Sequence, residues 1–85
     1  MAQVIVTIKV MPTGIDVDLE KLEQDIKYAV NPDRINKEPV AFGLVALIVT
    51  TIVEDEGGQV DTLENKLRAI NGVNDVEVTG VTRTL

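Results

Sequence analysis

The sequence predicts an α+β fold whose strands and helices follow the order β-α-β-β-α-β, and three observations support it. Residues 3–11 alternate between apolar and other side chains, as a half-buried strand does. Two later segments, 19–30 and 60–70, carry apolar residues at helical spacing. Residues 44–53 form an almost wholly apolar run, which is typical of a central strand.

The first strand and the first helix are predicted from the first third of the chain. Four apolar residues share the buried face of the strand: Val4, Val6, Ile8 and Val10. Pro12-Thr13-Gly14 ends this strand, and Asp16 and Asp18 are candidate N-caps for the helix. The apolar stripe of the helix comprises five residues: Leu19, Leu22, Ile26, Ala29 and Val30. Asn31-Pro32-Asp33 then ends the helix.

The second and third strands are predicted over residues 34–42 and 44–53. Pro39 places the second strand at a sheet edge, because proline cannot donate a hydrogen bond to a neighbouring strand. One of two apolar sets in the third strand must face away from the helices: Leu44, Ala46, Ile48 and Ile52, or Val45, Leu47, Val49 and Val53. An apolar open face would favour a partner or self-association. We expect four polar residues to keep it hydrated: Thr7, Lys9, Thr50 and Thr51.

The second helix and the last strand follow an acidic turn at residues 54–58. Asp61 and Glu64 have the spacing of a capping box, and Gly72 stands where a C-terminal glycine cap belongs. The apolar stripe of this helix comprises four residues: Val60, Leu63, Leu67 and Ile70. The last strand is expected over residues 73–83, with an interruption at Gly80.

These elements together predict a ferredoxin-like two-layer sandwich formed by residues 1–85 as a single domain. Right-handed crossovers place both helices on one face of a four-stranded antiparallel sheet. The first and third strands then lie in the middle, and the second lies at an edge.

The composition argues against an enzyme. The chain has no Cys, no His and no Ser, so the usual nucleophiles and proton carriers are missing. The acidic segment that begins at Asp16 departs from a calcium loop, because Lys21 and Lys27 occupy the positions that need glycine and glutamate. The turn at residues 54–56 is acidic but matches no ligand spacing. We therefore expect no catalytic, cofactor or metal site and no small-molecule substrate.

Charge and hydropathy indicate where the protein works. Fourteen acidic and eight scattered basic residues give a formal net charge of −6, which disfavours direct binding to nucleic acid. The apolar run 42–49 is too short to span a bilayer, and the N-terminus enters a strand pattern without a targeting segment. We expect a cytoplasmic protein that does not bind membranes.

Phe42 is the only phenylalanine, and it stands before Gly43 between two strand patterns. It lies either at the tip of a hairpin, where an exposed aromatic ring can anchor a partner, or inside the small core. Its position in the sequence leaves both interpretations open.

Three parts of the chain resemble the archaeal translation elongation factor 1-beta family, the guanine nucleotide exchange factors for elongation factor 1-alpha. They are residues 4–12 with 17–20, residues 38–44 with 46–47, and residues 72–73 with 76–79 and 81–83. The resemblance covers essentially the whole chain. The middle part, which contains Pro-Val-Ala-Phe-Gly-Leu, is the specific one.

The resemblance implies a ferredoxin-like domain that promotes exchange of GDP for GTP on the elongation factor 1-alpha GTPase by protein–protein contact. This exchange regenerates the active form of the GTPase during protein synthesis. It needs no catalytic side chain, since a factor that binds the nucleotide-free GTPase better than the GDP-bound form accelerates release.

The resemblance also implies which residues contact the GTPase. In eukaryotic relatives an aromatic residue of the matching segment packs against it, and Phe42 with Gly43 is the match, which favours the hairpin tip. Those relatives use a lysine just before the C-terminal residue to disturb the magnesium site, whereas this chain has Thr84 there and Arg83 as the nearest cation. Val45 likewise replaces a basic residue common in eukaryotes. The expected partner-binding residues are Ala41, Phe42, Gly43, Leu44, Arg83, Thr84 and Leu85.

Two other classes of protein share the predicted fold. A small regulatory or ligand-sensing domain would act as a dimer with a polar pocket at its interface. An acylphosphatase-like enzyme is disfavoured, because the loop Pro12-Thr13-Gly14 lacks an arginine-bearing phosphate cradle.

Overall fold

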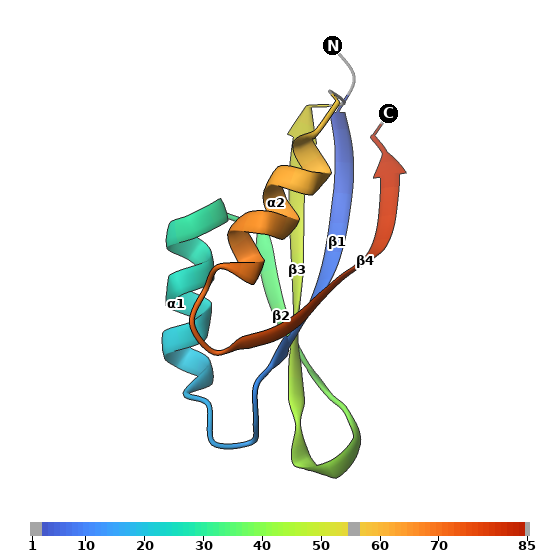
Figure 1. Ribbon diagram of the computed structural model, residues 1–85. Coiled ribbons are helices and arrows are strands. Elements are labelled where there is room, and N and C mark those ends of the chain that lie inside the picture. The colour runs from blue at the N-terminus through green and yellow to red at the C-terminus, as the bar shows by residue number, and fades with distance from the viewer. Residues whose placement is uncertain (1–2, 55–56, 85) are drawn as a thin grey trace.

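The computed structural model describes residues 3–54 and 57–84, and its elements follow the predicted order (Figure 1). The strands are β1 (Gln3–Pro12), β2 (Arg34–Pro39), β3 (Val45–Glu54) and β4 (Val73–Arg83). The helices are α1 (Leu19–Val30) and α2 (Gln59–Arg68), and a short 3-10 turn, η1, spans Ala41–Gly43. The predicted β-α-β-β-α-β fold is confirmed.

The four strands form one antiparallel sheet in the order β2-β3-β1-β4. Both helices lie on the same face of this sheet, as expected (Figure 1). β2 is an edge strand, and Pro39 is its last residue, opposite Val45. The strand therefore ends at Pro39 rather than at residue 42, because the chain turns into η1.

One apolar core fills the space between the sheet and the helices. Its buried members are Val4, Val6, Ile8, Val10, Leu22, Ile26, Leu47, Val49, Leu63, Leu67 and Val76. The predicted buried face of β1 and the central residues of both helical stripes are thus confirmed. The outer members of the stripes, such as Leu19 and Ile70, are partly buried at its margin. Neither aromatic residue of the chain belongs to this core.

The open face of the sheet carries the even-numbered residues of β3. Leu47 and Val49 belong to the core, so their neighbours Ile48 and Ile52 point the other way. Thr51 was expected on the open face, and this expectation is wrong. It is 4% exposed, because alternation along β3 places it on the helix side with Leu47 and Val49.

Polar groups cover part of that open face. Lys9 lies opposite Ile48 and Glu38 lies opposite Ala46 in the strand register. The Lys9 Nζ–Glu38 Oε2 ion pair, at 3.5 Å, therefore crosses β3 on this face. Ala46 is fully buried as a result, while Ile52 remains 43% exposed.

Both ends of α1 lie where the sequence predicted them. Asp18 is the N-cap, and its Oδ1 accepts hydrogen bonds from the backbone N–H groups of Glu20 (3.1 Å) and Lys21 (3.2 Å). Asn31 ends the helix in a left-handed conformation, with φ 45°.

Two expectations about α2 are wrong. The helix begins after Gly58, which makes no side-chain cap, so Asp61 lies inside the first turn and forms no capping box with Glu64. Glu64 instead pairs with Arg68 one turn later, with Oε2 3.5 Å from Nη2. Gly72 lies beyond the C-cap residue Ala69 and has φ 96°. It is a turn residue before β4 rather than a helix cap.

β4 continues through Gly80 with an irregularity in its pairing. Thr7 lies opposite Gly80, whereas Ile8 lies opposite Val78, so Thr79 is an extra residue in β4. The Thr79 hydroxyl donates a hydrogen bond to the Thr7 carbonyl at 3.2 Å. The interruption expected at Gly80 is therefore a bulge, and the strand does not end there.

Candidate protein-binding surface

The turn between β2 and β3 is closed by two backbone hydrogen bonds. The N–H of Val40 donates to the carbonyl of Leu44 at 2.8 Å, and the N–H of Leu44 donates to the carbonyl of Ala41 at 3.3 Å. Between them, η1 carries Phe42 at the end of the hairpin. The aromatic residue is therefore held by the backbone on both sides.

Phe42 is 96% exposed, so it lies at the hairpin tip and the interpretation that buries it in the core is wrong. Its backbone has φ 61° and ψ 30°, in the left-handed region that bulky residues rarely adopt. Such a conformation costs an L-residue about 1–2 kcal/mol. The chain thus keeps a strained aromatic residue in solvent, and residues with these properties cluster at functional sites.

Relief of this strain should stabilise the fold. We expect Phe42→Asn to raise the free energy of unfolding by about 0.5–1 kcal/mol, because Asn tolerates the left-handed conformation and no packing is lost. Urea denaturation of both proteins measures the change. Ala41→Asn, at the neighbouring position without a positive φ, should bring no gain. A lower stability of Phe42→Asn would show that the ring packs on the fold.

The loop between β1 and α1 lies beside this tip, at the same end of the molecule (Figure 1). Ile15 of this loop is 74% exposed, and its Cγ2 lies 3.7 Å from the place that a Cβ on Gly43 would occupy. The candidate residues did not include Ile15. An isolated apolar residue between Gly14 and Asp16, outside both neighbouring apolar patterns, was the available signal.

Arg83 and Thr84 lie at the other end of the sheet (Figure 1). The backbone N–H and the hydroxyl of Thr84 both donate to the Gln3 carbonyl, at 3.0 Å and 3.2 Å. Arg83 is exposed and lies opposite Val4 at the end of β4. Leu85 lies outside the described residues. The structure therefore does not bring the six described candidate residues together, and the longest dimension of the molecule is 42 Å.

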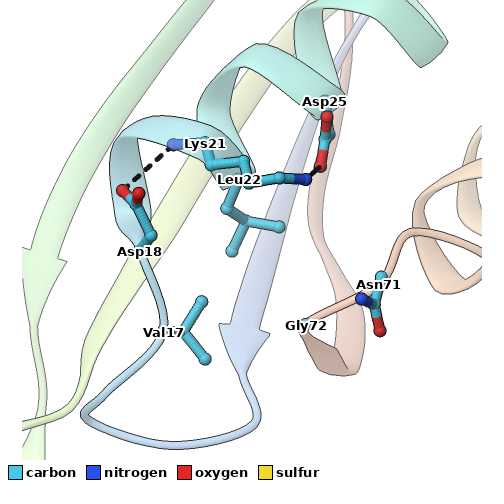
Figure 2. A pocket seen from close by; sticks show the side chains of 7 residues that line it. All are labelled: Val17, Asp18, Lys21, Leu22, Asp25, Asn71 and Gly72. Atoms are coloured by element: carbon cyan, nitrogen blue, oxygen red, sulfur yellow. Dashed lines mark hydrogen bonds and ion pairs between the residues drawn. The ribbon is translucent and has the colours of Figure 1, made fainter.

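A hollow of about 180 Å³ lies between the start of α1 and the loop before β4 (Figure 2). Seven residues line it: Val17, Asp18, Lys21, Leu22, Asp25, Asn71 and Gly72. Lys21 Nζ pairs with Asp25 Oδ2 at 3.2 Å, and the Asp18 carboxylate caps the helix. Each charged group of the lining thus has a partner within the protein, and the hollow offers no free charge to a ligand.

Residues 3–54 and 57–84 contain no group of three or more Asp or Glu side chains close enough together to bind a metal ion. The acidic turn considered as a weak metal site includes Asp55 and Glu56, which lie outside the described residues. Within the part of the chain that the structure describes, neither α1 nor α2 is long and apolar enough to cross a membrane.

Comparison with protein families identifies the exposed tip as part of a known kind of domain. Residues 5–84 match the family model described as the EF-1 guanine nucleotide exchange domain. The chain belongs to this family. Its members are nucleotide exchange factors and not enzymes, which confirms both the predicted function and the expectation of no catalysis of its own.

Relatives named elongation factor 1-beta match over nearly their whole length. The one from Methanothermobacter thermautotrophicus is 44% identical over 89 residues, with both chains fully covered. The one from Methanoregula boonei is 45% identical over 83 residues, covering 96% of this chain and 98% of the relative. The one from Natronomonas pharaonis is 39% identical, covering 98% and 99%. The predicted resemblance to archaeal elongation factor 1-beta is confirmed.

A solved structure supports the fold. The ACT domain from GTP pyrophosphokinase of Chlorobium tepidum, solved by NMR, matches with a TM-score of 0.71 and 19% identity. The match covers 92% of this chain and 88% of the ACT domain. It confirms the ferredoxin-like arrangement of the exchange domain, and at this identity it shows the fold alone.

Proposed function

We propose that this exchange domain accelerates release of GDP from elongation factor 1-alpha by direct contact through two separate surfaces, in the cytoplasm and as one domain of residues 1–85. The first surface is the hairpin tip, Ala41 to Leu44. The second is the C-terminal segment, Arg83 to Leu85. The observation that carries the proposal is Phe42, which an exchange domain presents at 96% exposure in a strained conformation.

The tip suits the role of a binding anchor. Burial of a phenylalanine ring removes roughly 150–250 Å² from water, and truncation of a well-buried interface anchor costs about 2–4 kcal/mol. The two hydrogen bonds that close the turn hold Phe42 in place before the partner arrives. Little backbone conformational entropy is then lost on binding, which leaves more of the contact energy for affinity.

Exchange follows from the thermodynamics of this binding. If the domain binds the nucleotide-free GTPase more tightly than the GDP-bound form, then GDP affinity must fall by the same factor. A coupling free energy of about 2–3 kcal/mol weakens GDP binding by roughly 30- to 150-fold. No proton transfer or covalent step is required, in agreement with a chain that has no His, Cys or Ser.

The two surfaces impose a condition on the partner. Because the hairpin tip and the described residues Arg83 and Thr84 lie at opposite ends of a molecule 42 Å long, the GTPase must contact the two surfaces with two separate patches. The tip supplies an apolar anchor, whereas the other end supplies the cation Arg83. We therefore assign affinity mainly to the tip and electrostatic attraction mainly to the C-terminal segment.

The test is the release of fluorescently labelled GDP from elongation factor 1-alpha of the same organism, chased with unlabelled nucleotide. The release rate should rise with the concentration of this protein and then saturate. A rate that stays at its spontaneous value at micromolar concentrations of the domain would overturn the proposal.

Arg83→Ala should lower the second-order rate constant of stimulated GDP release by about 3- to 10-fold at low salt, and less at high salt. Charges at the margin of an interface act mainly through association rates, which salt reduces. Arg34→Ala, which removes an exposed cation from the edge strand β2, is the matched control. Equal rates for the two variants would remove Arg83 from the proposed contact.

A further inference from the structure

We infer that Ile15, in the loop between β1 and α1, is a second apolar contact for the same GTPase, and that the partner there has an apolar depression bordered by basic groups. This inference rests on the proposed function and deepens it. We call Ile15 and Phe42 together the tip patch.

The exposure of Ile15 has no explanation within the fold. Five large hydrophobic residues are exposed among the described residues: Ile15, Tyr28, Phe42, Ile52 and Val81. Ile15 and Phe42 come from different loops. Ile15 lies close to Gly43, the residue after Phe42: its Cγ2 is 3.7 Å from the position that a Cβ on Gly43 would occupy. Two exposed apolar residues therefore lie at the same end of the molecule, and Ile15 is next to the proposed contact surface at the hairpin tip.

The loop holds Ile15 in place rather than leaving it loose. The N–H of Thr13 donates to the Gly72 carbonyl at 2.9 Å, which ties the start of the loop to the turn before β4. The N–H of Val17 reaches back to the Gly14 carbonyl at 3.5 Å, and Asp18 then caps α1. Ile15 thus occupies the second position of a turn, where polar residues and proline are the usual choice. An apolar residue at such a turn position that gains no burial in the core indicates a functional role.

The charges beside the tip patch indicate which charges border the complementary site on the partner. Asp16 follows Ile15 directly and is exposed, and Asp18 is exposed close behind it. Lys21, in the first turn of α1, is paired with Asp25. The whole chain carries a net charge of −6. An apolar patch with acidic neighbours is complemented by an apolar depression with a basic margin.

The experiment measures stimulated GDP release from elongation factor 1-alpha for the wild type, Ile15→Ala and a matched control, Ile52→Ala. Ile52 is also a partly exposed isoleucine, but it lies on the open face of the sheet. We expect Ile15→Ala to lower the second-order rate constant by about 5- to 10-fold, with an unchanged thermal midpoint, as for loss of an interface contact. Ile52→Ala should stay within about 2-fold of the wild type.

A second variant tests the basic margin. Asp16→Asn keeps the size of the side chain and removes its charge. We expect slower association with the GTPase and a weaker dependence of the association rate on salt. If Asp16→Asn associates with the GTPase at low salt as fast as the wild type or faster, the inferred basic margin is overturned.

The outcomes separate this inference from the proposed function. If the wild type does not accelerate GDP release, the proposed function fails and the inference fails with it. If the wild type is active and Ile15→Ala matches Ile52→Ala, the inference alone is overturned. A specific loss in Ile15→Ala, with the fold intact, supports it.

Discussion

Phe42→Ala is expected to slow stimulated GDP release by about 30-fold or more, which corresponds to loss of an interface anchor worth at least about 2 kcal/mol. The free energy of unfolding should change by less than about 0.5 kcal/mol, because a ring that is 96% exposed makes little contact with the fold. The substitution keeps a Cβ, so the backbone strain of the tip remains. We therefore expect Phe42→Ala to change the rate of GDP release strongly and the free energy of unfolding very little.

The control for this prediction is Tyr28→Ala. Tyr28 is the other aromatic residue of the chain and is 94% exposed, but it lies on α1 and outside the tip patch. Its removal should leave GDP release unchanged. If Phe42→Ala and Tyr28→Ala behave alike, the hairpin tip is not the anchor. A stability loss of about 3–5 kcal/mol in Phe42→Ala would place the ring in the core after all.

Leu47→Ala should have the largest effect on stability. Leu47 is fully buried in the core beneath the helices, and removal of such a side chain costs about 2–5 kcal/mol. A domain of 85 residues has a total stability of roughly 4–13 kcal/mol, so a large share of it is lost. Exchange activity should fall only as the unfolded fraction rises, as measured by urea denaturation and GDP release at the same temperature.

Ile48→Ala is the matched control for Leu47→Ala. Ile48 is the next residue of β3, but it points to the open face and is only partly buried. Its removal should cost clearly less than removal of Leu47. If Ile48→Ala were the more costly change, the helices would cover the opposite face of the sheet.

Local sequence patterns predicted most of the fold because they depend on backbone periodicity. Alternation in residues 3–11 and the apolar stripe of α1 each report a buried face with a period that the local conformation sets. Pro39 similarly marked an edge strand, because a proline has no N–H to share with a neighbour. These signals need no knowledge of distant residues.

The wrong predictions, for the start of α2 and for Thr51, arose where one local sequence signal competes with another. Asp61 and Glu64 have capping-box spacing, yet α2 starts earlier, after Gly58, because Gly58 with φ 85° allows the chain to enter the helix there. Thr51 was assigned by polarity, although its parity along β3 places it with Leu47 in the core. Polarity is a weaker guide to orientation than strand alternation when only one threonine is concerned.

For the candidate contact residues too, the sequence indicated single residues but not how they are arranged in space. The resemblance to elongation factor 1-beta drew attention to Phe42 and Arg83 but not to their separation. Ile15 was missed because its neighbour Gly43 is far away in the sequence. Only folding brings the β1–α1 loop to the hairpin tip (Figure 1).

The sequence by itself determined the order of the elements, the buried faces of β1, α1 and α2, the edge position of β2 and the family to which the chain belongs. These properties follow from periodicity, from the chemistry of single residues and from similarity along the chain. The tertiary structure alone decided that Phe42 stands in solvent, that Ile15 lies beside the hairpin tip and that Arg83 and Thr84 lie at the opposite end. Each of these facts depends on how segments far apart in the chain pack together, and no local pattern records that packing.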